Sequence, residues 1–368
     1  MNVGLVFAIG ESFRDFTKHG QDKLVVDQDL KAYSQSFKKV FIFSYEDEKY
    51  QLFSNNQLIA NTNRLHRFIY CFLMPVLKSP EIKQCDVLRG FQVTGGIPCL
   101  IAKILWQKPF LINYGYDYQA VAKIENKPIK SFLYALLSTV ILKAADGVIV
   151  ATPKLAQKVK GHSKKVFVIP NSVDTQMFKP KETKNFLKSV KKIIFVGRLE
   201  PQKNLISLLE AVSTLEEKPA LVFIGKGSQK KNLVDYAKRN HINLTIIGVV
   251  SHRKLPGYLR SADLFILPSF TEGHPKALLE AMSCGLPCIG ANVDGINDVI
   301  IHKKNGILTG TTAQEIRKGI KHLLKNKQLI QKLSKSARSS IIESYDAKVI
   351  LKKEIQLVKN VALNSRKK

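Results

Sequence analysis

Two glutamates, Glu272 and Glu280, lie within a segment that reads PSFTEGHPKALLEAMSCGLPCIG over residues 268–290. The apolar run at 264–267 predicts a buried strand, and residues 275–285 predict a helix, because proline favours a helix start and glycine its end. The first amides of such a helix and its dipole attract a phosphate group. The two carboxylates are then placed to accept hydrogen bonds from sugar hydroxyls. The alternative is an ordinary strand–turn–helix unit with two solvated glutamates.

A second cluster of polar residues follows the strand predicted at 193–196 and reads GRLEPQKN over residues 197–204. Gly197 lets the backbone turn tightly at the end of that strand. Arg198 and Lys203 bring two cations close to a predicted helix start, which suits the binding of a diphosphate. The alternative is that both are solvated side chains of a very basic protein.

Two further strands predicted in the second half of the chain are followed by turns of small or apolar residues. The strand at 221–224 leads to Gly225, Lys226 and Gly227, and the strand at 244–248 leads to Val249 and Val250. A Gly-x-Gly turn alone is a weak signal. Ligands of parallel sheets bind outside the carboxyl ends of the strands, so these turns are expected to border the same site as the two clusters above.

The Glu272-x7-Glu280 spacing and the Gly-Arg-Leu…Lys-Asn motif at 197–204 resemble the donor site of retaining glycosyltransferases of family 4. The segment Pro170-Asn171-Ser172-Val173-Asp174 is similar to the Pro-Asn-Gly-Val-Asp segment of that family. The resemblance covers nearly all of residues 165–310 and the first half in outline. It implies transfer of a sugar from a UDP- or GDP-sugar to an acceptor hydroxyl, with the anomeric configuration retained.

The resemblance also implies roles for individual residues. Glu272 would orient the donor sugar, and Arg198 and Lys203 would stabilise the departing diphosphate, so these three are the expected catalytic residues. Glu280 would hold the ribose. The expected donor-binding residues are Gly197, Gly225, Lys226, Gly227, Val249, Val250, Gly273, His274, Pro275, Lys276 and Glu280. No cofactor is expected, and no metal, because the protein supplies the cations and the sequence has no Asp-x-Asp motif.

Three residues of the first half are candidates for the acceptor side: Gly20, Tyr114 and Asp117. Relatives carry a paired-glycine turn after the first strand, of which the segment KHGQ keeps Gly20. Many relatives place a sugar-facing histidine where Tyr114 stands here, and Asp117 follows it closely.

The alternation of apolar strands and helices predicts an α/β protein of the GT-B type, with two Rossmann-like, doubly wound domains facing across a cleft. The expected domains are 1–178 for the acceptor, a linker at 179–191, and 192–345 for the nucleotide-sugar donor. Residues 346–368 are expected to form a helix that crosses back to the first domain and ends in a basic tail. Strands are expected at 3–9, 40–44, 86–88, 110–114, 147–151 and 166–170 of the first half, and a short helix at 295–300 of the second.

No apolar run reaches the roughly 20 residues that a membrane-spanning helix needs. The longest runs, at 68–77 and 132–142, are interpreted as buried helices. Shallow insertion of the first into a membrane is an alternative, because Arg64, Arg67 and Lys78 flank it. The chain begins with an apolar strand and no basic leader, so export is not expected.

The charge is strongly positive, with 58 Lys and Arg against 29 Asp and Glu, a net of +29. The lysines are spread along the chain without a nucleic-acid-binding module, so nucleic acid is not an expected partner. Attraction to an anionic membrane and plain solvation both stay open. The five cysteines form no metal-binding pattern and predict reduced thiols in a cytoplasmic protein.

The expected partners are therefore a nucleotide sugar and a saccharide or lipid-linked acceptor, and the expected location is the cytoplasm. An anionic membrane surface as a further partner, with a peripheral position at the inner face of the membrane, stays open. Envelope polysaccharide or glycolipid synthesis is the setting that the resemblance implies. Two other functions stay open at this point: a nucleotide-sugar epimerase with the same fold, and a nucleotide-sugar or lipid-binding protein without catalysis.

Overall fold

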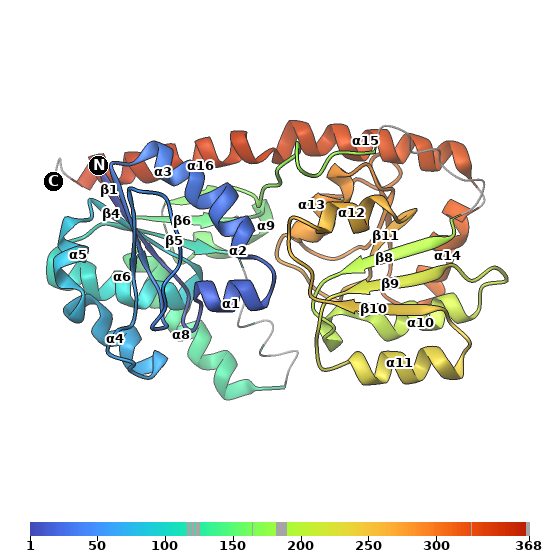
Figure 1. Ribbon diagram of the computed structural model, residues 1–368, viewed down its shortest axis with the longest axis horizontal. Coiled ribbons are helices and arrows are strands. Elements are labelled where there is room, and N and C mark those ends of the chain that lie inside the picture. The colour runs from blue at the N-terminus through green and yellow to red at the C-terminus, as the bar shows by residue number, and fades with distance from the viewer. Residues whose placement is uncertain are drawn as a thin grey trace. The chain divides into compact units, whose positions relative to one another are not determined.

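The computed structural model of the chain describes residues 1–115, 119, 122, 126–163, 165–181, 190–324 and 326–365. The chain divides into two compact units: unit 1 is Met1–Pro170 with Val349–Lys368, and unit 2 is Asn171–Lys348 (Figure 1). Each unit is built on a parallel sheet with helices packed on it. The predicted α/β class is thereby confirmed.

Unit 1 contains a seven-stranded sheet in the order β3-β2-β1-β4-β5-β6-β7. Its strands are β1 Asn2–Val6, β2 Lys39–Phe43, β3 Asn56–Ile59, β4 Val87–Gly90, β5 Phe110–Tyr114, β6 Gly147–Val150 and β7 Val166–Val168. All neighbouring pairs are parallel. The central strands are buried on both faces, which explains their unbroken apolar sequences.

The helices of unit 1 connect these strands and cover the sheet. They are α1 Phe13–Lys18, α2 Asp22–Leu24, the π-helical turn η1 Val25–Leu30, α3 Lys31–Ser36, α4 Arg67–Leu77, α5 Ser79–Gln84, α6 Gln92–Trp106, α8 Pro128–Ala144, α9 Pro153–Lys160 and α16 Ala347–Ser365. The sequence predicts helices around 24–37, 97–106, 129–145 and 153–160, but not α1, α5 or the edge strand β3. No helix within the described residues has both the length and the apolar character to cross a bilayer.

Residues 68–77 and 132–142 were interpreted as buried helices, and the prediction of burial is wrong for both. Both segments are helical, as α4 and within α8, but each buries only one side. Phe72 is 56% exposed and Phe132 is 69% exposed. An apolar run predicts a helix with an apolar surface, and it does not say how much of that surface the sheet covers.

The C-terminal helix α16 packs on unit 1 through Ile355, Val358 and Ala362. A buried ion pair fixes it there, with Arg89 Nη1 on β4 lying 2.8 Å from Glu354 Oε1. The Tyr33 hydroxyl donates to Glu354 Oε1 at 2.9 Å, so the carboxylate is hydrogen-bonded as well as paired.

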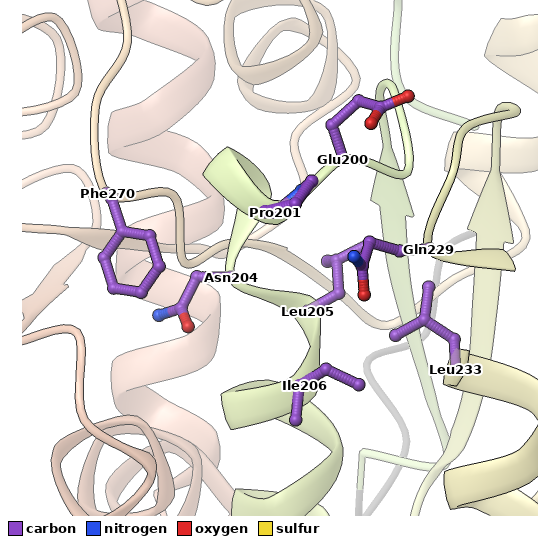
Figure 2. A pocket seen from close by; sticks show the side chains of 8 residues that line it. All are labelled: Glu200, Pro201, Asn204, Leu205, Ile206, Gln229, Leu233 and Phe270. Carbon is purple, nitrogen blue, oxygen red and sulfur yellow. The ribbon is translucent and has the colours of Figure 1, made fainter. Parts of the chain in front are cut away.

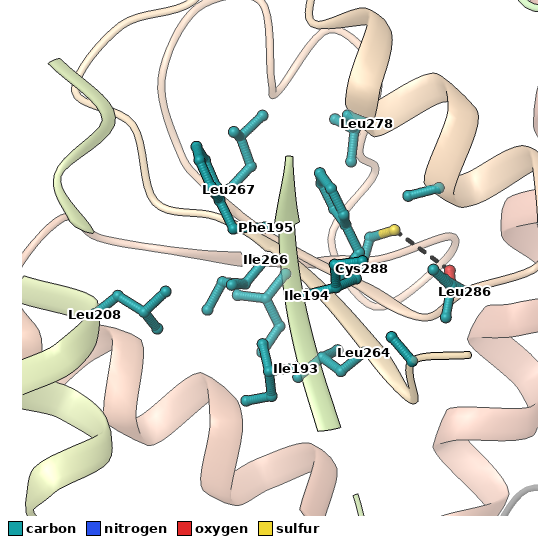
Figure 3. Packing of buried hydrophobic residues seen from close by; sticks show 14 of the residues in the cluster. Ile193, Ile194, Phe195, Leu208, Leu264, Ile266, Leu267, Leu278, Leu286 and Cys288 are labelled. Carbon is teal, nitrogen blue, oxygen red and sulfur yellow. Dashed lines mark hydrogen bonds between the residues drawn. The ribbon is translucent and has the colours of Figure 1, made fainter. Parts of the chain in front are cut away.

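Unit 2 contains a six-stranded parallel sheet in the order β10-β9-β8-β11-β12-β13. Its strands are β8 Lys192–Val196, β9 Ala220–Ile224, β10 Leu244–Gly248, β11 Leu264–Leu267, β12 Cys288–Ala291 and β13 Ile307–Thr309. Its helices are the 3₁₀ turn η2 Pro201–Lys203, α10 Leu205–Ser213, α11 Lys230–Arg239, α12 Leu255–Arg260, α13 Lys276–Ser283, α14 Ala313–Leu324 and α15 Lys327–Tyr345. Figure 3 shows the core around β8 and β11, where Ile194, Phe195 and Ile266 pack together with Leu278 from α13.

Two details of unit 2 differ from the sequence prediction. Residues 171–178 were expected in the first domain, yet Val173 and Phe178 are buried in the core of unit 2, and the Ser283 hydroxyl donates to the Phe178 carbonyl at 2.7 Å. Most of the predicted linker, 182–189, lies outside the described residues. The helix expected at 295–300 is instead a series of turns over 294–299, in which Gly295 has a φ of +80°.

Candidate functional site

The site in unit 2 lies where the sheet changes its winding direction. From β8 the chain runs outward to β9 and β10, and it then returns to β11 on the other side of β8. In a doubly wound sheet the loops after two such strands diverge and leave a crevice for a ligand. The loops after β8 and β11 carry the two predicted clusters, which the fold therefore brings together.

The loops after β8 and β11 are joined by a buried ion pair. Lys203 Nζ lies 2.5 Å from Glu272 Oε1, and the two side chains are only 12% and 9% exposed. The Ser269 hydroxyl donates to the same Glu272 oxygen at 2.7 Å. An ammonium group has three N–H donors, so Lys203 keeps donors for a second acceptor while it holds Glu272.

Backbone contacts fix the position of this pair. The Phe270 amide donates to the Gln202 carbonyl at 2.9 Å, and Gln202 Nε2 donates to the Thr271 carbonyl at 3.0 Å. Asn204, in a left-handed conformation with φ +55°, donates from Nδ2 to the Pro268 carbonyl at 3.1 Å. The loop after β8 and the loop after β11 thus form one rigid assembly around Lys203 and Glu272.

Glu280 is buried in the middle of α13, and its partner is a residue that the sequence analysis missed. His252 Nε2 lies 2.9 Å from Glu280 Oε1, and both side chains are less than 10% exposed. The His252 ring also packs against Phe178, with ring centroids 5.0 Å apart. One sequence signal was available, because His252 follows β10 and so belongs to the same edge of the sheet as the other loops.

The turn before α13 contains Gly273, His274 and Pro275. Pro275 is the N-cap residue and has no side chain to cap the helix. Its carbonyl accepts from the Leu278 amide at 3.1 Å, so the first two amides of α13 depend on another acceptor. The backbone of Gly273 is tightly packed, because a Cβ on Gly295 would lie 2.4 Å from its carbonyl oxygen. Lys276, in the first turn, is half-buried.

The side chain of His274 is turned into the protein. It is 6% exposed, its ring lies 5.3 Å from that of Tyr345, and Nδ1 finds no hydrogen-bond partner among the described residues. Burial, with a smaller effect from the Lys276 cation, lowers the pKa of His274 to about 4. The imidazole is therefore neutral at pH 7, and only the backbone of His274 is positioned to contact a ligand.

The glycines after β8 and β9 allow two loops to touch through their backbones. A Cβ on Gly225, whose φ is +144°, would lie 1.9 Å from the Gly197 carbonyl oxygen, and a Cβ on Gly227 would lie 2.3 Å from that of Leu199. The Leu199 amide donates to the Lys226 carbonyl at 2.9 Å. No larger residue fits these positions without moving the loops.

The remaining predicted residues of unit 2 are more exposed. The side chains of Arg198 and Lys226 reach the surface, and Val249 is 39% exposed at the end of β10. Val250 is half-buried beside it. The two predicted cations thus differ, since Arg198 is exposed whereas Lys203 is buried against Glu272.

A small cavity of about 170 Å³ lies beside this assembly (Figure 2). Its lining residues are Glu200, Pro201, Asn204, Leu205, Ile206, Gln229, Leu233 and Phe270. None of the predicted donor residues lines it, and ligand pockets typically measure about 300–1,000 Å³. We therefore place the candidate site at the strand ends and not in this cavity.

In unit 1 two of the three acceptor candidates lie within the described residues. Tyr114 is buried at the end of β5, and Asp117 lies outside the described residues. Gly20 was expected in the loop directly after the first strand. That position is wrong, because α1 intervenes and Gly20, with φ +68°, lies between α1 and α2. The glycine in the loop after β1 is Gly10, with φ +84°.

Part of the chain resembles proteins of a known family. Residues 177–340 match the family described as glycosyl transferases group 1. A curated relative, UDP-Gal:alpha-D-GlcNAc-diphosphoundecaprenol alpha-1,3-galactosyltransferase of Escherichia coli, is 32% identical over 198 residues. That match covers 50% of this chain and 51% of the relative, so the chain spans about half of that relative's length.

Two solved structures resemble the chain over nearly its whole length. Sucrose-phosphate synthase of Thermosynechococcus elongatus has a TM-score of 0.82 at 16% sequence identity. The match covers 98% of this chain and 99% of that structure. Anabaena Alr3699/HepE, solved with UDP and glucose, has a TM-score of 0.76 at 15% identity with the same coverage. The chain has the GT-B fold, and its residues 177–340 match the model of the glycosyl transferases group 1 family.

Proposed function

We propose that the chain is a retaining glycosyltransferase of family 4. It transfers a sugar from a UDP- or GDP-sugar to a hydroxyl group of a saccharide or lipid-linked acceptor. The observation that carries the proposal is the Lys203–Glu272 pair at the winding change of the unit 2 sheet, next to the uncapped start of α13. That combination offers a cation, a carboxylate and helix amides to one ligand.

The diphosphate is the group that this site suits best. When the bond between the anomeric carbon and the diphosphate oxygen breaks, negative charge develops on the leaving oxygen. Arg198, Lys203 and the first amides of α13 stabilise that charge, and fixed donors of this kind contribute more to rate than mobile water does. The Lys203–Glu272 contact keeps the ammonium in place before the ligand arrives.

The two glutamates have separate tasks in this proposal. Glu272 accepts hydrogen bonds from hydroxyls of the donor sugar, and its bonds to Lys203 and Ser269 orient the carboxylate. Glu280 accepts from the ribose hydroxyls, and His252 fixes its position. Val249, Val250 and the Gly225–Gly227 turn border the base and the phosphates.

The reaction retains the configuration if the acceptor attacks from the face that the diphosphate leaves. The acceptor oxygen forms the new bond to the anomeric carbon, and its proton passes to an oxygen of the departing phosphate. No protein nucleophile takes part in this scheme. Tyr114 and Asp117 are proposed to contact the acceptor or the sugar.

The proposed setting is envelope polysaccharide or glycolipid synthesis in the cytoplasm, at the inner face of the membrane. The printed name of the Escherichia coli relative supports a lipid-linked acceptor, since that protein acts on a diphosphoundecaprenol compound. The structure of HepE with UDP and glucose supports a nucleotide-sugar donor.

The test is a thermal-shift screen with UDP, GDP and their sugars, followed by NMR of the product made from the donor that binds. A ligand that binds only the folded protein raises its melting temperature by mass action. The proposal predicts a shift with one class of nucleotide and a product with the anomeric configuration of the donor. An inverted product, or epimerised sugar formed from the donor alone, contradicts it.

A further inference from the structure

Helix α4 has an apolar face on the side that points away from the core of unit 1. Its buried side is formed by Tyr70, Cys71 and Met74. The exposed side chains are Phe68, Ile69, Phe72, Leu73, Val76 and Leu77. They recur at the spacing of one helical stripe, so the outer face of α4 is apolar where a helix of a water-soluble protein normally carries polar residues.

Helix α8 also exposes apolar side chains to solvent. Ile129 is 77% exposed, Phe132 is 69% exposed, and Leu133 and Leu136 are also exposed, whereas Ser131 is buried and donates to the Gln119 carbonyl. The first half of α8 thus turns Ser131 inward and apolar side chains outward, whereas Ile141 and Leu142 near the end of the helix are buried in the core. The arrangement indicates that the outer face of α8 meets an apolar environment.

The two helices belong to one surface. α6 packs against both α4 and α8, and all three are seen on the same side of the unit 1 sheet (Figure 1). The end of α6 adds Ile104, which is 71% exposed, and Leu105. We call the exposed apolar side chains of α4, α8 and the end of α6 the apolar face. Such an extended apolar surface marks a docking site.

The charges around the apolar face identify its partner. The segments 64–78, 101–108 and 127–143 contain eight Lys or Arg and no Asp or Glu. Two of these cations are paired with carboxylates from neighbouring segments, Arg64 with Asp47 and Lys103 with Asp146. Apolar side chains ringed by cations suit the interface of an anionic bilayer. A second copy of this chain is a poorer partner for the apolar face. A symmetric contact would bring the same cations together, and they would repel one another in a protein of net charge +29.

We propose that the apolar face inserts shallowly into a bilayer that contains anionic lipid, so that unit 1 lies on the membrane surface. The inference deepens the proposed function, since it names the surface that brings the chain to a lipid-linked acceptor. Its test does not use sugar transfer, and the two can therefore fail separately.

The experiment is flotation of the full chain with vesicles of phosphatidylcholine alone or with one quarter phosphatidylglycerol. We expect binding to the anionic vesicles that weakens as salt is added. Phe68→Ser/Phe72→Ser and, separately, Phe132→Ser/Leu133→Ser should each lower the partition coefficient more than about tenfold. Lys130→Gln/Lys143→Gln should lower it about 25-fold, since each cation contributes about a factor of five.

The matched control is Ile301→Ser/Ile342→Ser, which removes two exposed apolar side chains of unit 2 and should leave binding unchanged. All the variants change exposed residues, so each should keep the melting temperature and the nucleotide-induced shift of the parent chain. Unchanged binding of the α4 and α8 variants overturns the proposal, as does equal binding to both vesicle types. A dimer in sedimentation that the same substitutions abolish, without vesicle binding, assigns the apolar face to a second copy.

Discussion

His252 Nε2 lies 2.9 Å from Glu280 Oε1, and both side chains are buried in unit 2. The contact joins the loop after β10 to the middle of α13, which are 28 positions apart in the sequence. It gives Glu280 one fixed orientation before any ligand binds. In the proposed reaction His252 is thus a positioning residue, because it acts through Glu280.

Replacing His252 with alanine should leave the Glu280 carboxylate buried without its partner. Such a loss costs about 1–3 kcal/mol. We expect a lower melting temperature and weaker nucleotide binding by calorimetry, with less effect on turnover at saturating donor. His252→Gln, which keeps a donor, should restore part of the affinity. His162→Ala, at an exposed histidine of unit 1, serves as control. Full affinity in His252→Ala would show that Glu280 needs no orienting partner.

Substitutions of Glu280 and Glu272 should differ in their effects on binding of the nucleoside diphosphate and its sugars. Glu280→Ala should weaken binding of the free nucleoside diphosphate about tenfold or more, since hydrogen bonds to a charged group contribute about 1.5–3 kcal/mol. Glu272→Ala should leave that affinity closer to the parent value and instead reduce discrimination between donor sugars. Calorimetry with the diphosphate and with two of its sugars measures both. The reverse pattern would exchange the two roles.

Lys203 and Arg198 are expected to differ in their effect on stability. Lys203→Ala leaves Glu272 without its cation in a buried place, which costs about 3–5 kcal/mol. Arg198→Ala, at an exposed position, should cost about 1 kcal/mol or less. Both should lose turnover.

The double variant Lys203→Met/Glu272→Gln separates structure from chemistry. It removes both charges of the buried pair, so it should recover most of the stability that Lys203→Ala loses and still transfer no sugar. Urea unfolding and a transfer assay measure the two quantities. Recovered transfer in the double variant would show that Lys203 serves the fold alone.

The stability of unit 2 should depend on pH through His274. Its pKa falls from 6.5 to about 4 on folding, chiefly because it is buried. The folded state therefore disfavours protonation, so this stabilisation is complete above pH 6.5 and is lost as the pH falls toward 4. At pH 5 the loss should be about 2 kcal/mol. His274→Phe, which can pack on Tyr345, should flatten the slope of the unfolding free energy between pH 7 and 5 relative to the parent chain. Parallel slopes contradict the prediction.

Gly225 should tolerate no side chain. In Gly225→Ala the new Cβ meets the Gly197 carbonyl at 1.9 Å, so the loops after β8 and β9 must separate and nucleotide binding should be lost. Gly248→Ala has a positive φ of +83° but open space, and it should cost only about 1 kcal/mol. Gly161→Ala, with open space and an ordinary φ of −67°, is the neutral control. Urea unfolding measures the loss of stability in each of the three variants.

The sequence predicted most strands and the loops after β8 and β11, because buried parallel strands are unbroken apolar runs and their loops follow in order. It did not predict β3, since Asn56 and Gln57 make an edge strand look like a loop. It placed Gly20 wrongly, because a short helix such as α1 has too little periodicity to detect. His252 was missed because its partner, Glu280, is distant in the sequence. Burial of α4 and α8 was overestimated, since apolar composition alone cannot distinguish a core from an outward apolar face.

The Arg89–Glu354 pair has a consequence for how the protein is made. Unit 1 is discontinuous: residues up to 170 supply its sheet, and the helix that neutralises Arg89 comes only after the whole of unit 2. On the ribosome, domains generally fold as they emerge, yet this one must wait for the last residues of the chain. We infer that unit 2 completes its core first, and that a fragment ending at residue 170 leaves a buried guanidinium without its counter-ion.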